Sequence, residues 1–476
     1  YPLIHNKLFQ SMNTVENDSN RTNPFPAEHA ITSFRKLDFD PISSVCEIID
    51  NSVEADATEI KIKFDWSEYP DGGQYASRSI FIDNGKGMNE SILKKYLLMG
   101  MGEKKALENG IGKFGVGATL AGISSAKHID AYSKTNGGEW LYTYLDISEI
   151  LKGVFVPPPI QKDPPIEINT NLDHGTIIIW SDVDVLEKAL LEEHVFPPTS
   201  QNSTELHDED ILSTEVSRIY RKFMTSKKYV KGEPIDNTNP VTIEIQNQKL
   251  EPYDPLYITY NPRKEDDDKP IIKYKSHPIR FGKNSGNMHI TTSYFPDSWW
   301  ADEYRPGNAK NNIARKIGER NEGVSLVREG REIFFGKIPR FWINDVGGER
   351  HAHKYKEHDR WTGFEIEFGR DADDIFNIQS NKSKLSIRKE LKKELSRKMS
   401  HTIVSRREEF SKKTGESKRK RGKSGGGSTG TGKTKIQQIT DPKYDTEQKK
   451  DLLKTALNYV KDKKNKAEIE DAYNDL

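Results

Sequence analysis

The stretch PISSVCEIIDNSVEADA, residues 41–57, decides the fold class of this chain. Its apolar residues fall at positions 42, 45, 48, 49 and 53, the spacing of one helical face, and Pro41 suits a first turn. The next segment, EIKIKF at 59–64, alternates strictly between polar and apolar residues, as a half-buried strand does. A helix followed directly by such a strand predicts a domain that mixes helices and strands.

The elements expected around this pair continue the mixed pattern. Several of the strands look paired as hairpins, so an α+β sandwich is favoured over a doubly wound parallel sheet. The first region has expected strands at 79–82, 128–132, 140–146 and 176–180 and helices at 90–98 and 114–124. After a helix at 216–223, a second α+β region at 240–400 has expected strands at 241–245, 323–327, 332–335 and 364–368, followed by a basic helix at 387–412.

Composition sets limits on function. With 476 residues the chain is long enough for two or three domains, and its 73 Lys and Arg balance its 73 Asp and Glu. Whole-chain charge therefore gives no reason to expect nucleic acid, a membrane surface or an acidic substrate. No apolar run approaches the roughly 18 residues that span a bilayer. The single cysteine, Cys46, permits no internal disulfide, so a cytoplasmic location, or a nuclear one in a eukaryote, is the default expectation.

Three segments carry residues suited to binding a nucleotide. Glu47 and Asn51 lie four residues apart on the first helix and project from one face, which pairs a base for activating water with an oxygen ligand for Mg²⁺. A strand then ends in IDNGKGM at 82–88, where Asp83 offers an acceptor and the glycines let the backbone approach a flat ring. Finally, GIGKFGVGA at 110–118 exposes successive backbone N–H groups before a helix, which suits phosphates.

In this order and spacing, the three segments resemble the GHKL superfamily: gyrase B, the ninety-kilodalton heat-shock chaperone, histidine kinases and mismatch-repair MutL. The resemblance covers about residues 30–180 and implies a Bergerat-fold α/β sandwich that binds ATP and Mg²⁺. It implies Glu47 as general base and Asn51 as the Mg²⁺ ligand, with Asp83 accepting from the adenine amino group and Thr176 in the water network beneath it. The remaining implied nucleotide contacts are Gly85, Gly87, Met88, Gly112, Lys113, Phe114, Gly115, Val116 and Gly117.

Glu47 favours hydrolysis, because the kinase branch lacks a catalytic carboxylate there and no phosphoacceptor-histidine hairpin precedes this domain. The sequence departs from the family pattern in one place. The family usually has Asp three residues after the Asn, whereas this chain has Glu54, with Asp56 close behind. Which of these two acids supports the site stays open at the level of sequence.

The second region extends the resemblance to an S5-like transducer domain. Transducers of this type send a lysine into the ATP site, and QSNKSK at 379–384 suits that loop, with Lys382 in the role and Lys384 as the alternative. The run GVSLVREGREI at 323–333 is most similar to Microrchidia (MORC) ATPases and their prokaryotic relatives.

The expected organisation is an arm at 1–30, an ATP-binding domain at 31–200, a transducer at 201–411, a basic low-complexity linker at 412–440 and a C-terminal segment at 441–476 with a helix at 446–459. Residues 412–435 hold nine Lys or Arg and one acid. Residues 427–434, GSTGTGKT, match the P-loop expression, but the basic, glycine-rich residues before them and Pro442 after them do not supply the strand and helix that a P-loop needs.

These features predict a Mg²⁺-dependent ATPase that works as an ATP-gated homodimeric switch or clamp, with the basic linker as its candidate DNA contact. The alternative is a chaperone-like or protein-partner switch, such as a defence-system subunit, that binds no DNA. The sequence names neither client nor pathway, and it predicts no membrane partner.

Overall fold

The computed structural model describes residues 27–35, 40–98, 117–168, 171–183, 192–195, 207–230, 233–259, 268–281, 284–301, 322–336, 357–376 and 389–424. The chain divides into two compact units, residues 1–408 and 409–476. In the part of the chain that is described, no helix is both long and apolar enough to cross a membrane.

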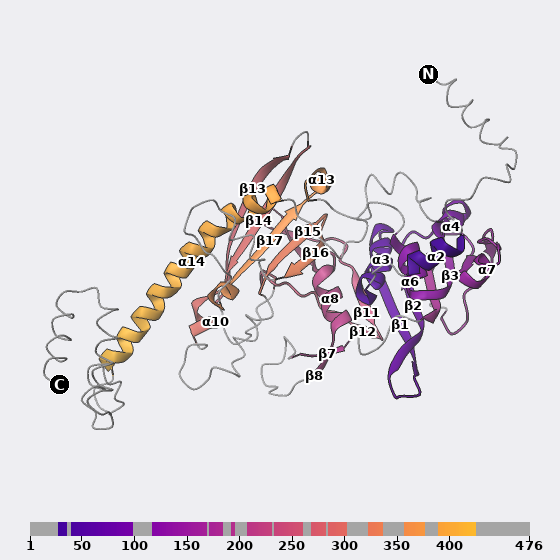
Figure 1. Cartoon of the computed structure of the whole chain (residues 1–476), viewed down its shortest axis with the longest axis horizontal. Coiled ribbons are helices and arrows are strands. Elements are labelled where there is room, and N and C mark those ends of the chain that lie inside the picture. The colour runs from indigo at the N-terminus through magenta and orange to yellow at the C-terminus, as the bar shows by residue number, and fades with distance from the viewer. Residues whose placement is uncertain are drawn as a thin grey trace, which may run out of the picture. The chain divides into compact units, whose positions relative to one another are not determined.

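Among the described residues, the first sheet has eight strands in the order β12-β11-β1-β2-β6-β3-β4-β5. Figure 1 labels β1, β2, β3, β11 and β12 of this sheet. Every neighbouring pair is antiparallel except β1 and β11, which run parallel. The largely antiparallel pairing, with helices packed against it, confirms the expected α+β class. The strands are β1 Glu59–Glu68, β2 Gln74–Asp83, β3 Ala126–Lys134, β4 Leu141–Asp146, β5 Ile160–Gln161, β6 Gly175–Val183, β11 Thr242–Ile245 and β12 Gln248–Lys249.

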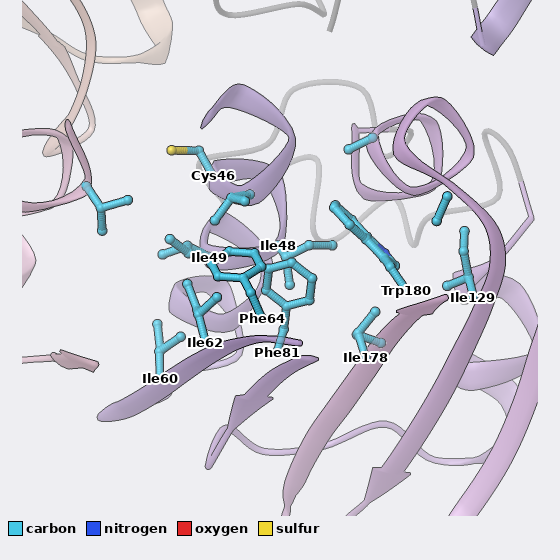
Figure 2. Close-up of a cluster of buried hydrophobic side chains, with 14 of the residues drawn as sticks. Cys46, Ile48, Ile49, Ile60, Ile62, Phe64, Phe81, Ile129, Ile178 and Trp180 are labelled. Atoms are coloured by element: carbon cyan, nitrogen blue, oxygen red, sulfur yellow. The ribbon is translucent and has the colours of Figure 1, made fainter. Parts of the chain in front are cut away.

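Helix α3 anchors the hydrophobic core of this sheet. Its Ile48 and Ile49 face the strand residues Ile62, Phe64 and Phe81 (Figure 2), and all five are at most 5% exposed. The apolar positions of residues 41–57 thus form the buried face that their spacing predicted. The helices of this region are α2 Ala27–Arg35, α3 Pro41–Glu54, α4 Glu90–Tyr96, α6 Gly117–Ser125 and α7 Ile147–Ile150.

The same core continues beyond residue 200, where the sequence placed the domain boundary. Helix α8, Ile211–Ile219, buries Leu212 and Val216 in it, and the short helix α9, Arg221–Met224, adds Met224. The strand expected at 241–245 forms as β11, but it pairs with β1 of the first sheet and does not belong to the second region. Apolar residues up to Leu250 are therefore buried in the same hydrophobic core as the first sheet.

The second sheet has five strands in the order β13-β14-β17-β15-β16. Its strands are β13 Ile271–Phe281, β14 Asn284–Tyr294, β15 Val324–Arg328, β16 Arg331–Gly336 and β17 Thr362–Phe368. Short elements fill the connections: β7 Glu192–Val195 with β8 His207–Asp210, β9 Lys227–Val230 with β10 Glu233–Asp236, α10 Asp297–Ala301, α13 Asp373–Phe376 and the 3₁₀ turns Glu357–Trp361 and Arg370–Ala372. The strands expected at 323–327, 332–335 and 364–368 all form.

The hairpin of β13 and β14 was not expected from the sequence. Its strands pair over eleven residues each, from Ile271 opposite Tyr294 to Phe281 opposite Asn284. Strand β13 lies at the edge of the sheet, where Pro278 is tolerated. The apolar alternation of β13 is interrupted at Ser276, His277 and Pro278, which makes the strand hard to recognise from sequence.

Helix α14 begins at Lys389 and packs Leu391, Leu395, Met399 and Ile403 against the second sheet. It continues to Ser424, so residues 412–424, expected to be flexible linker, are helical. Lys, Arg and Glu are good helix formers, and consecutive glycines follow the helix only at 425–427. The helix expected at 446–459 lies outside the described residues.

Candidate active site

Helix α3 carries the first two candidate side chains. It begins after Asp40, whose carboxylate caps it by accepting from the Ser43 N–H at 2.8 Å. Glu47 is 8% exposed, and Asn51, one turn later, is half-buried. A capped helix packed on the sheet therefore presents a carboxylate and a carboxamide from one face.

The Glu47 carboxylate lies against the first residue of α6. A Cβ placed on Gly117 would be 1.9 Å from Glu47 Oε2, so no residue with a side chain fits there while the carboxylate keeps its position. Gly117 is also the last of the glycines expected to bind phosphate. The structure thus brings the candidate base to the N-terminus of α6, where backbone N–H groups favour negative charge.

We expect Gly117→Ala to lower the hydrolysis rate about 100-fold, because the added methyl displaces the reacting group by an ångström or more. Only the tip of a flexible side chain has to move, so the free energy of unfolding should change little. Steady-state ATPase assays and urea unfolding test this. Gly122→Ala is the control: it lies on the same helix and would press on Ile129 in the core, so it should lower stability and spare the rate per folded molecule.

Asn51 is held by a neighbour that the sequence did not single out. Its side chain hydrogen-bonds to the Tyr96 hydroxyl at the end of α4. The Tyr96 carbonyl in turn accepts from Thr119 Oγ1 of α6 at 3.0 Å. Asn51 offers a carbonyl oxygen, a donor type that Mg²⁺ accepts, beside the Glu47 carboxylate. These residues therefore fit a Mg²⁺ ion that completes its shell with water and phosphate oxygens.

Asp83 closes the other end of the site, at the end of β2. The Gly85 N–H donates to Oδ1 at 2.9 Å, the Ser52 hydroxyl donates to Oδ2 at 3.0 Å, and the Thr176 backbone also donates to the carboxylate. Burial raises the pKa of Asp83 to about 6, although these three hydrogen bonds oppose the shift. The result is an oriented acceptor that is ionised at neutral pH and loses its charge in mild acid.

ATP affinity should therefore fall with pH. If Asp83 accepts from the adenine amino group, binding favours the ionised carboxylate, and affinity should drop about tenfold between pH 7.5 and pH 5, with the loss starting near the raised pKa. Isothermal titration with ADP measures this. In Asp83→Asn, which does not titrate, binding should be weaker and the drop should be absent; an equal drop in both proteins would contradict the assignment.

The turn after Asp83 lies close to neighbouring backbone. Gly87 has φ +67°, and a Cβ there would be 2.0 Å from the Lys134 carbonyl oxygen, while a Cβ on Gly85 would be 2.8 Å from the Ala55 carbonyl oxygen. The Met88 N–H donates to Ser133 Oγ at 2.8 Å. The two glycines are thus required by packing, whatever they contribute to a ligand.

Ser133, Ser52 and His174 are site residues that sequence reasoning missed. Ser133 Oγ lies 3.0 Å from Thr176 Oγ1, and the His174 ring lies 2.6 Å from the Gly85 carbonyl oxygen through Nδ1. These groups join β3 and the start of β6 to the turn that holds Asp83. Ser133 lies in a strand with no motif around it, so nothing local could have identified it.

The two acids left open by the sequence lie at the end of α3. Asp56 has φ +59°, its side chain is 87% exposed, and it lies 3.8 Å from Lys86 Nζ. Glu54 is half-buried, and its backbone carbonyl accepts from Lys86 Nζ at 3.2 Å. Of the two acids, Asp56 is therefore the more exposed. Gly112, Lys113, Phe114, Gly115, Val116, Lys382 and Lys384 lie outside the described residues.

Comparison with known families agrees with this geometry. Residues 40–176 match the family described as histidine kinase-, DNA gyrase B-, and HSP90-like ATPase, a range that includes Glu47, Asn51, Asp83 and Thr176. No curated protein matches the chain. Residues 40–176 of this protein are therefore an ATPase domain of the GHKL type, which binds and hydrolyses ATP.

Proposed function

We propose that this protein is a Mg²⁺-dependent ATPase of MORC type that works as an ATP-gated homodimeric switch. One observation carries the proposal: Glu47, Asn51 and the N-terminus of α6 lie together, and Ser52, beside Asn51 on the same helix, donates to Asp83. A base, a metal ligand, an anion site and an adenine acceptor are the parts that ATP hydrolysis needs in one place.

In the proposed reaction, Asp83 orients the adenine. Asn51 would hold the Mg²⁺, which when bound would neutralise charge on the phosphates. Glu47 accepts a proton from the attacking water as its oxygen bonds to the γ-phosphorus and the bond to the β-γ bridging oxygen breaks. The catalytic parts act by position and charge, so turnover is expected to be slow and set by conformational change.

The second sheet is proposed to be the transducer. Residues 323–333, the run most similar to MORC proteins, form the hairpin of β15 and β16, which pairs Val324 with Gly336. Lys382, with Lys384 as the alternative, is proposed to contact the γ-phosphate and so report the nucleotide state. Comparing Lys382→Ala with Lys384→Ala in the ATPase assay distinguishes the two.

The switch is tested by the oligomeric state of the full chain with a non-hydrolysable ATP analogue. We expect light scattering to show a dimer with the analogue and a monomer with ADP, and Asp83→Ala, which cannot hold the adenine, to remain monomeric under both conditions. If the wild-type protein had the same molar mass with the analogue and with ADP, nucleotide-gated dimerisation would be rejected.

A second candidate function is DNA binding through the C-terminal end of α14. Residues 412–424 hold seven Lys or Arg and one acid, and they are helical, so their charges lie along one regular element. Duplex DNA should raise the ATPase rate at about 50 mM salt and much less at about 200 mM, because phosphate contacts depend steeply on salt. Replacing residues 418–421 with Gln should abolish the stimulation. No effect of DNA on either protein would favour the protein-partner switch.

A further inference from the structure

Helix α3 is contacted by the second sheet on a face next to the one that carries Glu47. Asp50 lies three residues after Glu47, directly before Asn51, and is 1% exposed. Arg331 of β16 donates from Nε to Asp50 Oδ1 at 2.6 Å. The two residues are 281 positions apart in sequence, so the contact joins the ATPase domain to a distant part of the fold.

Tyr220 completes the contact from the junction of α8 and α9. Its hydroxyl lies 2.6 Å from Asp50 Oδ1 and 2.8 Å from the carbonyl oxygen of Cys46. Cys46 and Asp50 lie on either side of Glu47 within about one helical turn. Tyr220 and Arg331 therefore both contact the turn of α3 that carries the candidate base. We refer to Asp50, Tyr220 and Arg331 as the clamp.

The clamp is buried and charged. Tyr220 is 0% and Arg331 5% exposed, and the guanidinium lies 5.8 Å from the centre of the Tyr220 ring. A buried ion pair adds little stability compared with a well-packed apolar pair, because its charges must leave water. Its hydrogen bonds are directional, however, and fix where the Asp50 side chain lies. The positive charge of Arg331 also interacts electrostatically with the Glu47 carboxylate.

The strand that supplies Arg331 is also held through its next residue. Glu332 accepts from Arg218 Nε of α8 at 2.6 Å and from Arg221 of α9 at 2.7 Å. Strand β16 therefore has little freedom to shift without breaking the buried ion pairs of Glu332 or the clamp. A movement of the second sheet would reach α3 through Arg331.

We propose that Arg331 is a positioning residue for ATP hydrolysis: from β16 it holds Asp50, together with Tyr220, and so orients the turn of α3 that carries Glu47. Hydrolysis then requires β16 to be docked on the ATPase domain, whereas ATP binding does not. The proposal rests on the proposed role of Glu47 as the base.

The test measures kcat, the KM for ATP and the urea midpoint of the full chain. Arg331→Gln should lower kcat about 100-fold, since misplacing a catalytic group by an ångström has effects of this size, with KM changed less than about threefold. Tyr220→Phe, which removes one hydroxyl and keeps the ring, should lower kcat less. Arg331→Lys keeps the charge without the guanidinium fork, so it should recover only part of the rate.

Two further variants separate positioning from stability. Asp50→Leu with Arg331→Met replaces the ion pair by apolar packing, and it should restore the urea midpoint while kcat stays low. The matched control is Arg360→Gln in the 3₁₀ turn Glu357–Trp361, which breaks a buried ion pair with Glu322 at 2.7 Å. It should lower the midpoint and leave kcat per ATP-binding molecule unchanged.

Wild-type kcat in the apolar double variant, or equal kcat in Arg331→Gln and Arg360→Gln, would overturn the proposal. If Arg331→Gln or the double variant does not fold, Tyr220→Phe takes its place in the comparison. A wild-type kcat in Tyr220→Phe would then overturn the proposal. Failure of the proposed function has a different signature: Glu47→Gln would then hydrolyse ATP at the wild-type rate.

Discussion

Glu47→Gln abolishes ATP hydrolysis and leaves ATP binding nearly unchanged; this is the largest effect on activity that we expect. The amide keeps the size of the side chain beside Gly117 but cannot accept the proton of the attacking water. A general base contributes about 10²- to 10⁴-fold to a rate, so kcat should fall by at least two orders of magnitude. Phosphate release under saturating ATP and calorimetric binding measure the two quantities.

Asp56→Asn is the matched control for this variant. It removes a carboxylate just after the end of the same helix, where the side chain is 87% exposed and close to Lys86. Its kcat should stay within about twofold of wild type, because an exposed ion pair contributes little to the stability of the folded structure. Hydrolysis retained by Glu47→Gln would reject Glu47 as the base, and a large loss in Asp56→Asn would point to the acids at the end of α3.

Arg221→Met lowers the free energy of unfolding by about 3–5 kcal/mol, the usual loss when one partner of a buried ion pair is removed. Arg221 is 4% exposed and donates to Glu332 at 2.7 Å, to Glu365 at 2.6 Å and to Ser325 Oγ at 2.8 Å. Burial acts to raise the pKa of Glu365, yet Lys222 and Arg221 together lower it to about 2. Removing Arg221 leaves buried carboxylates short of positive charge.

Urea unfolding followed by tryptophan fluorescence measures this change. Arg78→Gln is the control, because it breaks an ion pair with Asp65 at a similar distance, 2.6 Å, but with side chains 34% and 47% exposed. The free energy of unfolding of Arg78→Gln should be lower than that of the wild type by less than about 1 kcal/mol. If Arg221→Met were no more destabilising than Arg78→Gln, the ion network would not be holding α9 to the second sheet.

There is a physical reason why Ser133 and Tyr96 were not identified as site residues from the sequence. Glu47, Asn51 and Asp83 stand out because each lies in a local pattern, a helix face or a strand end with glycines. Ser133 and Tyr96 have no such pattern, and they reach the site only because β3 and α4 pack beside it. Their roles depend on packing, which short-range spacing does not encode.

The α+β class and the helix that carries Glu47 were determined by local sequence, since periodicity and turn chemistry act within a few residues. The candidate base, metal ligand and adenine acceptor were predicted from three local motifs together with the family resemblance that they carry. Only the tertiary structure decided that β11 pairs with β1 across about 180 residues and that Arg331 reaches Asp50. Strand pairing and buried ion pairs depend on which surfaces lose water together. That is a property of the whole folded chain, so no local pattern could have predicted the pairing of β11 with β1 or the clamp.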